Sequence, residues 1–378
     1  MDFAYNDDQA LLQDATRRFL EQRHPLAAVR AQLEADSTFD REVWRAGAEL
    51  GWAALLVPEQ YGGGSVTDQP VVDLCAVGEE LGRVLYPGPF LAANVVADAV
   101  ATFGDPQQKQ QYLTPIAAGD CVPTWCTTTD GSVDIAAIGV EATTTATGLR
   151  LDGVARYTHD AHQADLLLVA CNAVSGPSLV LVPLPTSGLQ VRVLGGLDLT
   201  RRLCEVSFEG VQVDTQQVLG PVGMAEETIW RAYRLATVVQ AAEAVGAAEQ
   251  VFEFTVQYAK DRKQFGRAIG GFQAIKHRLA DLLMELEGAR VATRYAALAV
   301  ADNRHDRDEA VFVAGAAVRD AFAFIAGESV QIHGGIGFTW EYDVHLFMRR
   351  AKVEQVLLGD PDWHREQLCR LVEAEVLA

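Results

Sequence analysis

Residues 262–273 read RKQFGRAIGGFQ, and this stretch constrains the fold more than any other part of the sequence. Apolar residues recur at helical spacing before and after it, so we expect one helix to end near Arg262 and another to begin near Gly271. An arginine, an amide and an aromatic ring lie between these ends. Arg262 could bind a phosphate, Gln264 a polar edge and Phe265 a ring system, although an ordinary helix–turn–helix corner could have the same composition.

A second stretch, residues 331–338, reads QIHGGIGF. Its glycines would let the backbone approach a ligand closely, with free N–H groups to bind an anion or a ring edge. By itself a glycine-rich stretch is equally typical of a flexible connection between helices. The order of the two stretches is therefore more informative than either one alone.

Outward from these stretches the chain divides into three zones. Residues 1–119 and 221–378 have apolar residues at helical spacing, broken by glycine and proline. Residues 120–220 contain short apolar runs instead, such as LLLVA at 166–170, which indicate strands separated by turns. The sequence thus predicts an N-terminal helical domain, a middle β domain and a C-terminal helical domain with these bounds.

Composition and charge exclude several classes of function. The 378-residue chain has 31 basic and 51 acidic residues, a formal net charge of −20, so we expect neither a nucleic acid nor an anionic membrane as partner. No uninterrupted apolar run is long enough to span a membrane, and the N-terminus lacks a secretory signal, which favours the cytoplasm. The six cysteines form no C-x-x-C pair, so we expect neither a disulfide framework nor a metal site.

Together, and in this order, the two glycine-containing stretches resemble the acyl-CoA dehydrogenase family. That family carries R-x-x-F-G-x-x-I-x-x-F-Q and, further on, Q-x-x-G-G-x-G-F, and both patterns stand here nearly complete. The F-x-Y-x-x-x-Q start and the helical, β, helical order also agree, so the resemblance covers essentially the whole chain. It implies an α+β multidomain fold with an N-terminal helical domain, a middle β-barrel or sandwich and a C-terminal four-helix bundle.

The resemblance also implies a reaction. Family members use FAD to desaturate an acyl-CoA thioester: a carboxylate removes the α-proton, the β-hydrogen passes to FAD as hydride, and electron-transfer flavoprotein accepts the electrons. The family is usually tetrameric, and the two C-terminal stretches bind the adenosine and pyrophosphate end of a neighbouring subunit's FAD. The residues matching that role here are Arg262, Gln264, Phe265, Gln331, His333, Gly334 and Gly335.

The catalytic base of the family is missing from its usual places. Its best-known base is a glutamate in a Y-E-G-T motif, and Leu358 occupies the matching position here, directly before Gly359. Other members place the base on the first long helix of the C-terminal domain, where Ala236 stands in this chain. A leucine or an alanine cannot accept a proton.

Glu243 is the candidate base that remains. It lies two helical turns beyond Ala236, on nearly the same face of the expected helix. Its neighbours in the sequence are almost all Ala, Val and Gly. They would partly remove the carboxylate from water and raise its pKa, which would suit a general base near neutral pH. A surface glutamate, or a buried glutamate paired with an arginine, is the alternative.

The motifs that would face the flavin ring are also degraded. Of the family's T-E-P-G-x-G-S-D, only Gly131 and Ser132 match in place, and Tyr157 stands where a tryptophan packs on the flavin. Ser132 and Tyr157 are therefore candidate contacts to this chain's own FAD. An intact half-site for a neighbour's FAD beside a weakened one of its own resembles subunits of actinobacterial heteromeric acyl-CoA dehydrogenases, several of which act on steroid side-chain thioesters.

Three functional hypotheses follow. The chain is one subunit of a heterotetrameric acyl-CoA dehydrogenase acting on a bulky, steroid-like acyl group, or a self-sufficient homotetrameric enzyme that uses Glu243. The third possibility is a non-catalytic scaffold or acyl-CoA-binding subunit of the same fold, which Leu358 and Ala236 favour and the intact C-terminal stretches oppose. The sequence does not identify the acyl chain.

Overall fold

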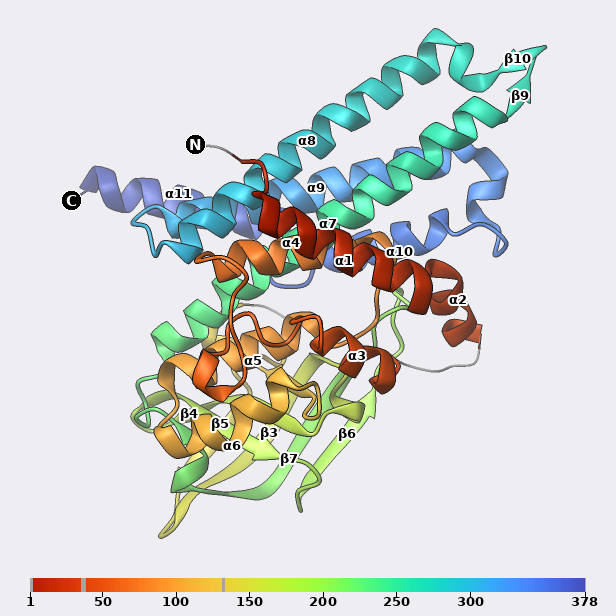
Figure 1. Ribbon diagram of the computed structural model, residues 1–378. Coiled ribbons are helices and arrows are strands. Elements are labelled where there is room, and N and C mark those ends of the chain that lie inside the picture. Colours follow the sequence, from red (N-terminus) through yellow and green to blue (C-terminus); the bar gives the residue numbers. More distant parts are fainter. Residues whose placement is uncertain (1–2, 35–38, 131–132, 378) are drawn as a thin grey trace.

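The computed structural model describes residues 3–34, 39–130 and 133–377 (Figure 1). Its first part is helical, as the sequence predicts. The helices are α1 (Asp7–Arg23), α2 (Leu26–Glu34), α3 (Arg41–Ala48), α4 (Pro70–Arg83), α5 (Phe90–Phe103) and α6 (Pro106–Ala117), with a 3-10 turn η1 (Glu59–Tyr61). Asp105 caps α6 by accepting a hydrogen bond from the amide of Gln108 at 2.8 Å, and Pro106 occupies the first turn, where its missing N–H costs nothing.

The middle part is one eight-stranded sheet. The strands are β1 (Pro123–Cys126), β2 (Val140–Thr144), β3 (Gly148–His159), β4 (Leu166–Ala173), β5 (Gly176–Pro183), β6 (Leu189–Val193), β7 (Leu203–Asp214) and β8 (Val218–Leu219). Their order is β6-β7-β3-β2-β4-β5-β8, and β1 pairs with β4 in parallel. Short 3-10 turns connect them: η2 (Ile135–Ala137), η3 (Ala161–Gln163) and η4 (Thr215–Gln217).

An irregularity in this sheet matters for the site. The pairing of β3 with β7 shifts register between Ala155 and Thr158, so Arg156 and Tyr157 fall out of the ladder. Tyr157 has a φ of 59°, in the left-handed region that non-glycine residues rarely adopt. Such a bulge re-aims a side chain, and here it turns Tyr157 away from the regular face of the strand.

The last part is helical again. It contains α7 (Glu226–Asp261), α8 (Gln273–Ala301), α9 (Arg307–His333), α10 (Val344–Glu354) and α11 (Pro361–Leu377), the 3-10 turns η5 (Ile269–Gly271) and η6 (Gly334–Phe338), and the hairpin strands β9 (Lys263–Gln264) and β10 (Arg267–Ala268). The predicted helix end near Arg262 and helix start near Gly271 are confirmed. Figure 1 shows α7 and α8 running beyond the rest of the molecule, with the β9–β10 hairpin at their far end.

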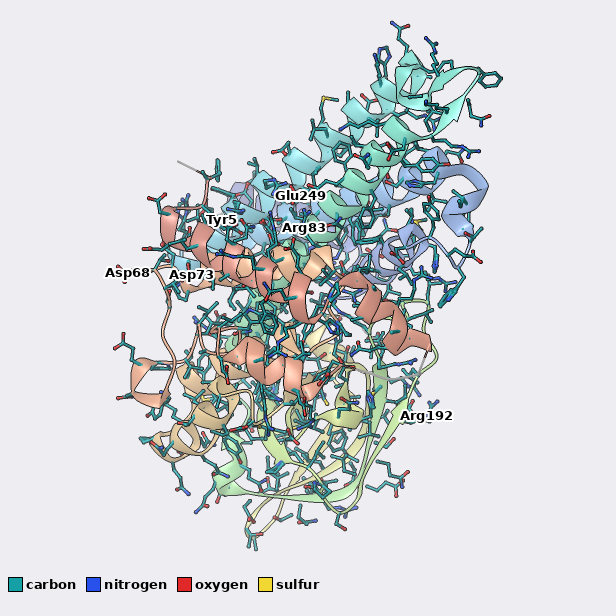
Figure 2. The ribbon with its side chains drawn as sticks, turned by 45° about the vertical axis from the view of Figure 1, so that its right-hand side comes forward. Tyr5, Asp68, Asp73, Arg83, Arg192 and Glu249 are labelled. Atoms are coloured by element: carbon teal, nitrogen blue, oxygen red, sulfur yellow. The ribbon has the colours of Figure 1, made fainter. Side chains whose placement is uncertain are left out.

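Two glycines let the N-terminal and C-terminal helices cross closely. A Cβ atom on Gly82 of α4 would lie 1.9 Å from the carbonyl oxygen of Glu243, and one on Gly246 of α7 would lie 1.8 Å from that of Glu79. Either contact is impossible, so this crossing requires glycine on both helices. Arg83 and Glu249 pair across the same crossing at 2.9 Å and lie side by side in Figure 2.

The segment Arg307–Phe338, which is α9 with the turn that follows it, is long and apolar enough to cross a membrane by length and composition. Arg319 and Asp320 interrupt its apolar sequence. However, 72% of its most apolar window is buried inside the protein, which is the behaviour of a central bundle helix.

The predicted succession of helical, sheet and helical parts along the chain is confirmed by the order of the helices and strands.

Candidate active site

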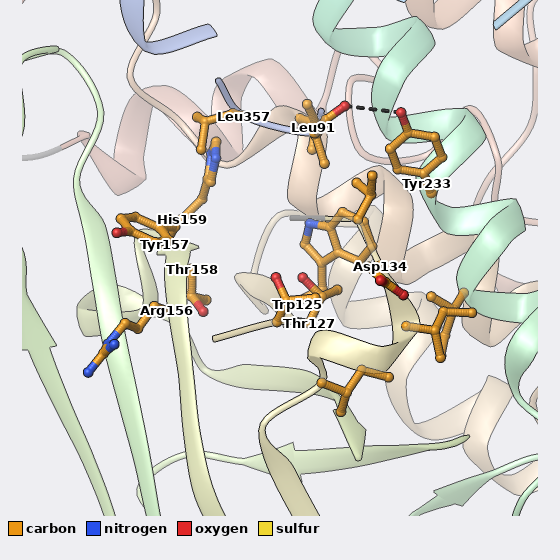
Figure 3. Close-up of a pocket in the computed structure, with 16 residues that line it drawn as sticks. Leu91, Trp125, Thr127, Asp134, Arg156, Tyr157, Thr158, His159, Tyr233 and Leu357 are labelled. Carbon is orange, nitrogen blue, oxygen red and sulfur yellow. Dashed lines mark hydrogen bonds between the residues drawn. The ribbon is translucent and has the colours of Figure 1, made fainter. Parts of the chain in front are cut away.

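A pocket lies where the middle sheet meets α5, α7 and the turn between α10 and α11 (Figure 3). Its wall is mostly apolar, with a few polar groups, which is the usual character of a small-molecule site. The lining residues are Leu91, Trp125, Thr127, Thr128, Val133, Asp134, Ile135, Ile138, Arg156, Tyr157, Thr158, His159, Ile229, Tyr233, Leu357 and Leu358.

Tyr157 lines this pocket, as expected of a residue standing in for a flavin-packing tryptophan, and its side chain is 41% exposed. The guanidinium of its neighbour Arg156 pairs with Glu205 at 2.7 Å, which draws that charge toward the sheet. A role for Tyr157 in binding FAD stays a prediction. Ser132, the other predicted contact, lies outside the described residues.

The turn that carries the degraded flavin motif is closed by its own hydrogen bonds. The amide of Thr129 donates to the carbonyl of Ala137 at 3.0 Å, and the amide of Arg156 donates to the carbonyl of Thr128 at 3.0 Å. Asp134 accepts from the amide of Ala136 at 2.9 Å. The amide of Thr129 and the carbonyl of Thr128 are thus already hydrogen-bonded within the chain.

Leu358 lines the pocket at the position where the family would carry its base. Its φ is 57°, and its carbonyl oxygen accepts a hydrogen bond from the hydroxyl of Tyr233 at 3.0 Å (Figure 3). Ala236 is fully buried on α7 and is not among the pocket residues. Neither position supplies a proton acceptor.

Glu243 lies on α7 and is also not among the pocket residues. Its carboxylate forms an ion pair with Arg201, which belongs to the loop before β7, and both side chains are buried. Arg201 bonds at the same time to Glu354 of α10 at 3.2 Å. The geometry thus matches the alternative of a buried glutamate paired with an arginine, and the role of Glu243 as a base stays a prediction.

The ion pair of Glu243 belongs to a larger buried cluster beside the pocket. Arg350 of α10 pairs with Asp198 and approaches Glu354 at 3.7 Å. Burial raises the pKa of Glu354 to about 7, against the opposing effect of the two arginines. Burial, with the charges of Arg201 and Arg350, lowers the pKa of His159 to about 3, so the imidazole at the pocket wall is neutral.

A second concave site lies at the far end of the bundle. It is a cleft of about 1090 Å³ between the ends of α7 and α9 and the segment before α10. It brings together the predicted residues Arg262 and His333, which the sequence places 71 positions apart. The ring of His333 stacks on that of Tyr258, with centroids 4.2 Å apart, and its Nδ1 lies 2.8 Å from the carbonyl of Ser329.

The other predicted residues of this second site are exposed around it. Gln264 and Phe265 lie on the β9–β10 hairpin, where the ring of Phe265 is 92% exposed. Gln331, Gly334 and Gly335 are exposed at the end of α9. The hairpin is therefore accessible from solvent.

The two concave sites cannot serve one ligand within one chain. Tyr233 lines the first and Arg262 the second, and α7 connects them without interruption. At 1.5 Å per residue the separation is roughly 40 Å, more than the diameter of a small domain. The two sites are therefore separate within one chain.

Sequence reasoning missed several site residues. Leu91, Ile229 and Tyr233 reach the pocket from α5 and α7, where they resemble ordinary core positions. Arg319 on α9, which binds the turn carrying Leu358, was also missed. An arginine within an otherwise apolar helix was the available signal, since a buried charge needs a purpose or a partner.

Comparisons with known proteins agree on one family. The profile of the acyl-CoA dehydrogenase N-terminal domain matches residues 6–120, and that of the acyl-CoA dehydrogenase C-terminal domain matches residues 231–372. The acyl-CoA dehydrogenase IpdE2 of Mycobacterium tuberculosis is 33% identical over 374 residues, covering 98% of each chain.

Among solved structures, a chain of the ChsE4–ChsE5 complex from M. tuberculosis superposes with a TM-score of 0.89 at 28% identity, covering 99% of each chain. A variant of the Tcur3481–Tcur3483 steroid acyl-CoA dehydrogenase gives the same TM-score and identity, covering 98% of this chain and 99% of that one.

Proposed function

Since the chain belongs to the acyl-CoA dehydrogenase family, we propose that it is one subunit of a heteromeric, FAD-dependent dehydrogenase that introduces a Cα–Cβ double bond into a bulky acyl-CoA thioester. The chain is accordingly an oxidoreductase of this family. In the reaction, a base takes the α-proton and the β-hydrogen leaves with its electron pair as hydride. Bound FAD supplies the hydride acceptor, and electron-transfer flavoprotein then takes the electrons.

The observation that carries the proposal is the distance between the two concave sites. One chain holds a cleft with Arg262 and a stacked His333–Tyr258 pair at one end, and an apolar pocket roughly 40 Å away. The cleft with Arg262 and the His333–Tyr258 pair suits the anionic and adenine end of a dinucleotide, because a guanidinium binds phosphate and aromatic faces stack on a base. The flavin ring of an FAD whose adenine end lies in this cleft would then lie in a neighbouring subunit's pocket.

The chain's own pocket supports an asymmetric pairing. The amide of Thr129 and the carbonyl of Thr128 are hydrogen-bonded within the chain, so these two groups are not available to the edge of a flavin. No proton acceptor stands at Leu358 or Ala236, and Glu243 is engaged by Arg201. These features favour an unlike partner that supplies what this chain's own pocket lacks.

The comparisons support the same arrangement. One relative in structure is a complex of two differently named chains, and another is called a steroid dehydrogenase of this class. The apolar wall of the pocket agrees with a hydrophobic acyl group. The substrate of this chain is therefore proposed to be a steroid-like side-chain thioester.

Co-expression tests the proposal. The chain is produced with each neighbouring gene of the same family, and co-purified pairs are incubated with acyl-CoA thioesters under anaerobic conditions. We expect a stable pair whose flavin absorbance bleaches with a bulky thioester, while the chain alone bleaches with none. Full bleaching by the lone chain would contradict the heteromer and favour a self-sufficient enzyme.

A further inference from the structure

The turn between α10 and α11 has an unusual backbone. Leu358 and Gly359 both have positive φ, 57° and 83°. Glycine adopts this conformation freely, but a bulky residue does so only where its surroundings force it. Gly359 is also confined, because a Cβ atom there would lie 2.6 Å from the ring of Trp363. The conformation of Leu358 therefore has a specific cause in its surroundings.

Arg319 of α9 is one such cause. Its Nε donates to the carbonyl oxygen of Glu354 at 3.1 Å, and its Nη2 donates to those of Leu357 at 3.1 Å and Leu358 at 3.5 Å. One planar guanidinium thus binds the last carbonyl of α10 and both carbonyls of the turn. A positive charge is favourable there, because the carbonyl end of a helix is negative.

Tyr233 of α7 is the second cause. Its hydroxyl donates to the carbonyl of Leu358 at 3.0 Å, the bond drawn as a dashed line in Figure 3. Its ring packs edge-to-face against Trp230 and Trp363, with centroids 5.5 and 5.6 Å apart. The aromatic neighbours fix the ring, so the hydroxyl is aimed at this one carbonyl.

Burying the charged guanidinium of Arg319 costs free energy, which indicates that its hydrogen bonds have a specific role. The side chain is 3% exposed, and among the described residues its guanidinium forms no ion pair with a carboxylate. Besides the turn, it donates to the carbonyl of Gly315 and to the side-chain oxygen of Gln240. A buried cation satisfied only by neutral oxygens destabilises a fold unless those bonds hold something of use.

From this geometry we propose that Arg319 and Tyr233 are positioning residues that hold Leu358 in the pocket wall, and that Leu358 decides which acyl groups fit. The inference rests on the proposed function only in taking the pocket as the acyl site. A wall held by a guanidinium and a phenol does not yield to a larger ligand. The isobutyl group of Leu358 thus excludes extra bulk only where the acyl group passes this turn, and it does not oppose a bulky group elsewhere in the pocket.

Substitutions at Leu358 separate volume from strain. Leu358→Gly opens the wall and suits the left-handed backbone, whereas Leu358→Ala opens it and keeps the strained conformation. Binding of octanoyl-CoA and of the bulkier cyclohexylacetyl-CoA to the full-length chain is measured by calorimetry. We expect both variants to shift the ratio of the two Kd values toward the bulky thioester by at least about tenfold.

The positioning residues are tested by Tyr233→Phe and Arg319→Lys, with Tyr295→Phe and Arg294→Lys as matched controls far from the pocket. We expect only Tyr233→Phe and Arg319→Lys to narrow the difference between the Kd values of octanoyl-CoA and cyclohexylacetyl-CoA. Hydrogen exchange of residues 355–359 in the ligand-free chain should accelerate in the same two variants. If the two residues had a purely structural role, the variants would weaken the binding of both thioesters equally. Hydrogen exchange in this turn would then be no faster than elsewhere in the chain.

The inference and the proposed function fail differently. Equal Kd changes for both thioesters in Leu358→Gly would overturn the inference, even if the chain with its partner is active. Failure of the wild-type chain to bind either thioester would overturn the assignment of the acyl pocket, and the inference with it. Full FAD loading of the lone chain would overturn the heteromer and leave the specificity role of Leu358 standing.

Discussion

The carboxylate of Glu243 is held by the guanidinium of Arg201, in a pair whose side chains are only 4% and 5% exposed. Arg201 comes from the loop before β7, and Glu243 from the centre of α7, so the pair connects the sheet to the helical bundle. Both partners were taken out of water to form it. Removing one partner of such a pair leaves an uncompensated buried charge, which is strongly destabilising.

Glu243→Gln therefore separates two roles. If the pair is structural, we expect the free energy of unfolding to fall while the complex with its partner keeps its kcat. The loss should stay below the ~3–5 kcal/mol of an unpaired buried charge, because Arg201 still has Glu354 as a partner at 3.2 Å. If Glu243 is the base, turnover disappears with flavin still bound. Urea unfolding and flavin bleaching measure the two effects, and Glu253→Gln, a half-exposed position on the same helix, is the control.

Glu354 makes the stability depend on pH. Burial raises its pKa from 4.5 to about 7, despite Arg201 and Arg350, so the folded chain keeps a proton that the unfolded chain has lost. Stability on this account is greatest below about pH 4.5 and falls as the pH rises to about 7, by up to ~1.4 kcal/mol per pH unit. Asp160, whose pKa burial also raises to about 7, contributes in the same direction.

Glu354→Gln should flatten this dependence without abolishing it, because Asp160 is still present. Unfolding by urea at a series of pH values between 5 and 7 measures the slope. A variant that keeps the full slope of the wild type would show that Glu354 is already ionised in the folded chain.

The exposed ring of Phe265 should matter only in an assembly. Phe265→Ala removes a side chain that is 92% exposed, so we expect the stability of the lone chain to change by less than about 0.5 kcal/mol. In the complex with its partner, the variant should retain less FAD after gel filtration, as should Arg262→Gln. Arg278→Gln, a half-exposed arginine on α8, serves as the control. Equal FAD retention in all three variants would exclude the β9–β10 hairpin from the cofactor site.

The crossing of α4 and α7 predicts a contrast between two glycines. Gly82→Ala would place a methyl group 1.9 Å from the carbonyl of Glu243, so we expect a loss of about 1–3 kcal/mol. Gly288→Ala lies on α8 with no atom within 4 Å, so it should raise stability by up to about 1 kcal/mol. Thermal unfolding of Gly82→Ala and Gly288→Ala measures the two changes in stability. Equal changes in the two variants would contradict the close crossing of α4 and α7.

Much of this structure follows from local sequence. The helix end near Arg262 and the helix start near Gly271 were predicted from the sequence, because glycine and the end of an apolar pattern act over one turn. The pairing of Arg201 with Glu243 was not readable, because it joins residues 42 positions apart across two parts of the fold.

The register shift that turns Tyr157 outward was equally hidden, because it depends on how β3 meets β7. The role of Arg319 was hidden for the same reason, since its partners lie on a turn that begins 35 residues later. Local patterns thus predicted two residues, Arg262 and His333, that line one cleft, whereas the pocket depends on contacts between distant segments.

The most direct measurement is the FAD content of the purified chain, alone and with its co-expressed partner, from flavin absorbance and protein concentration. We expect the lone chain to hold little FAD and the yellow complex to hold about one FAD per pair of unlike chains. One FAD per chain in the lone protein would contradict the central claim, because it would mean that copies of this chain complete the cofactor site by themselves.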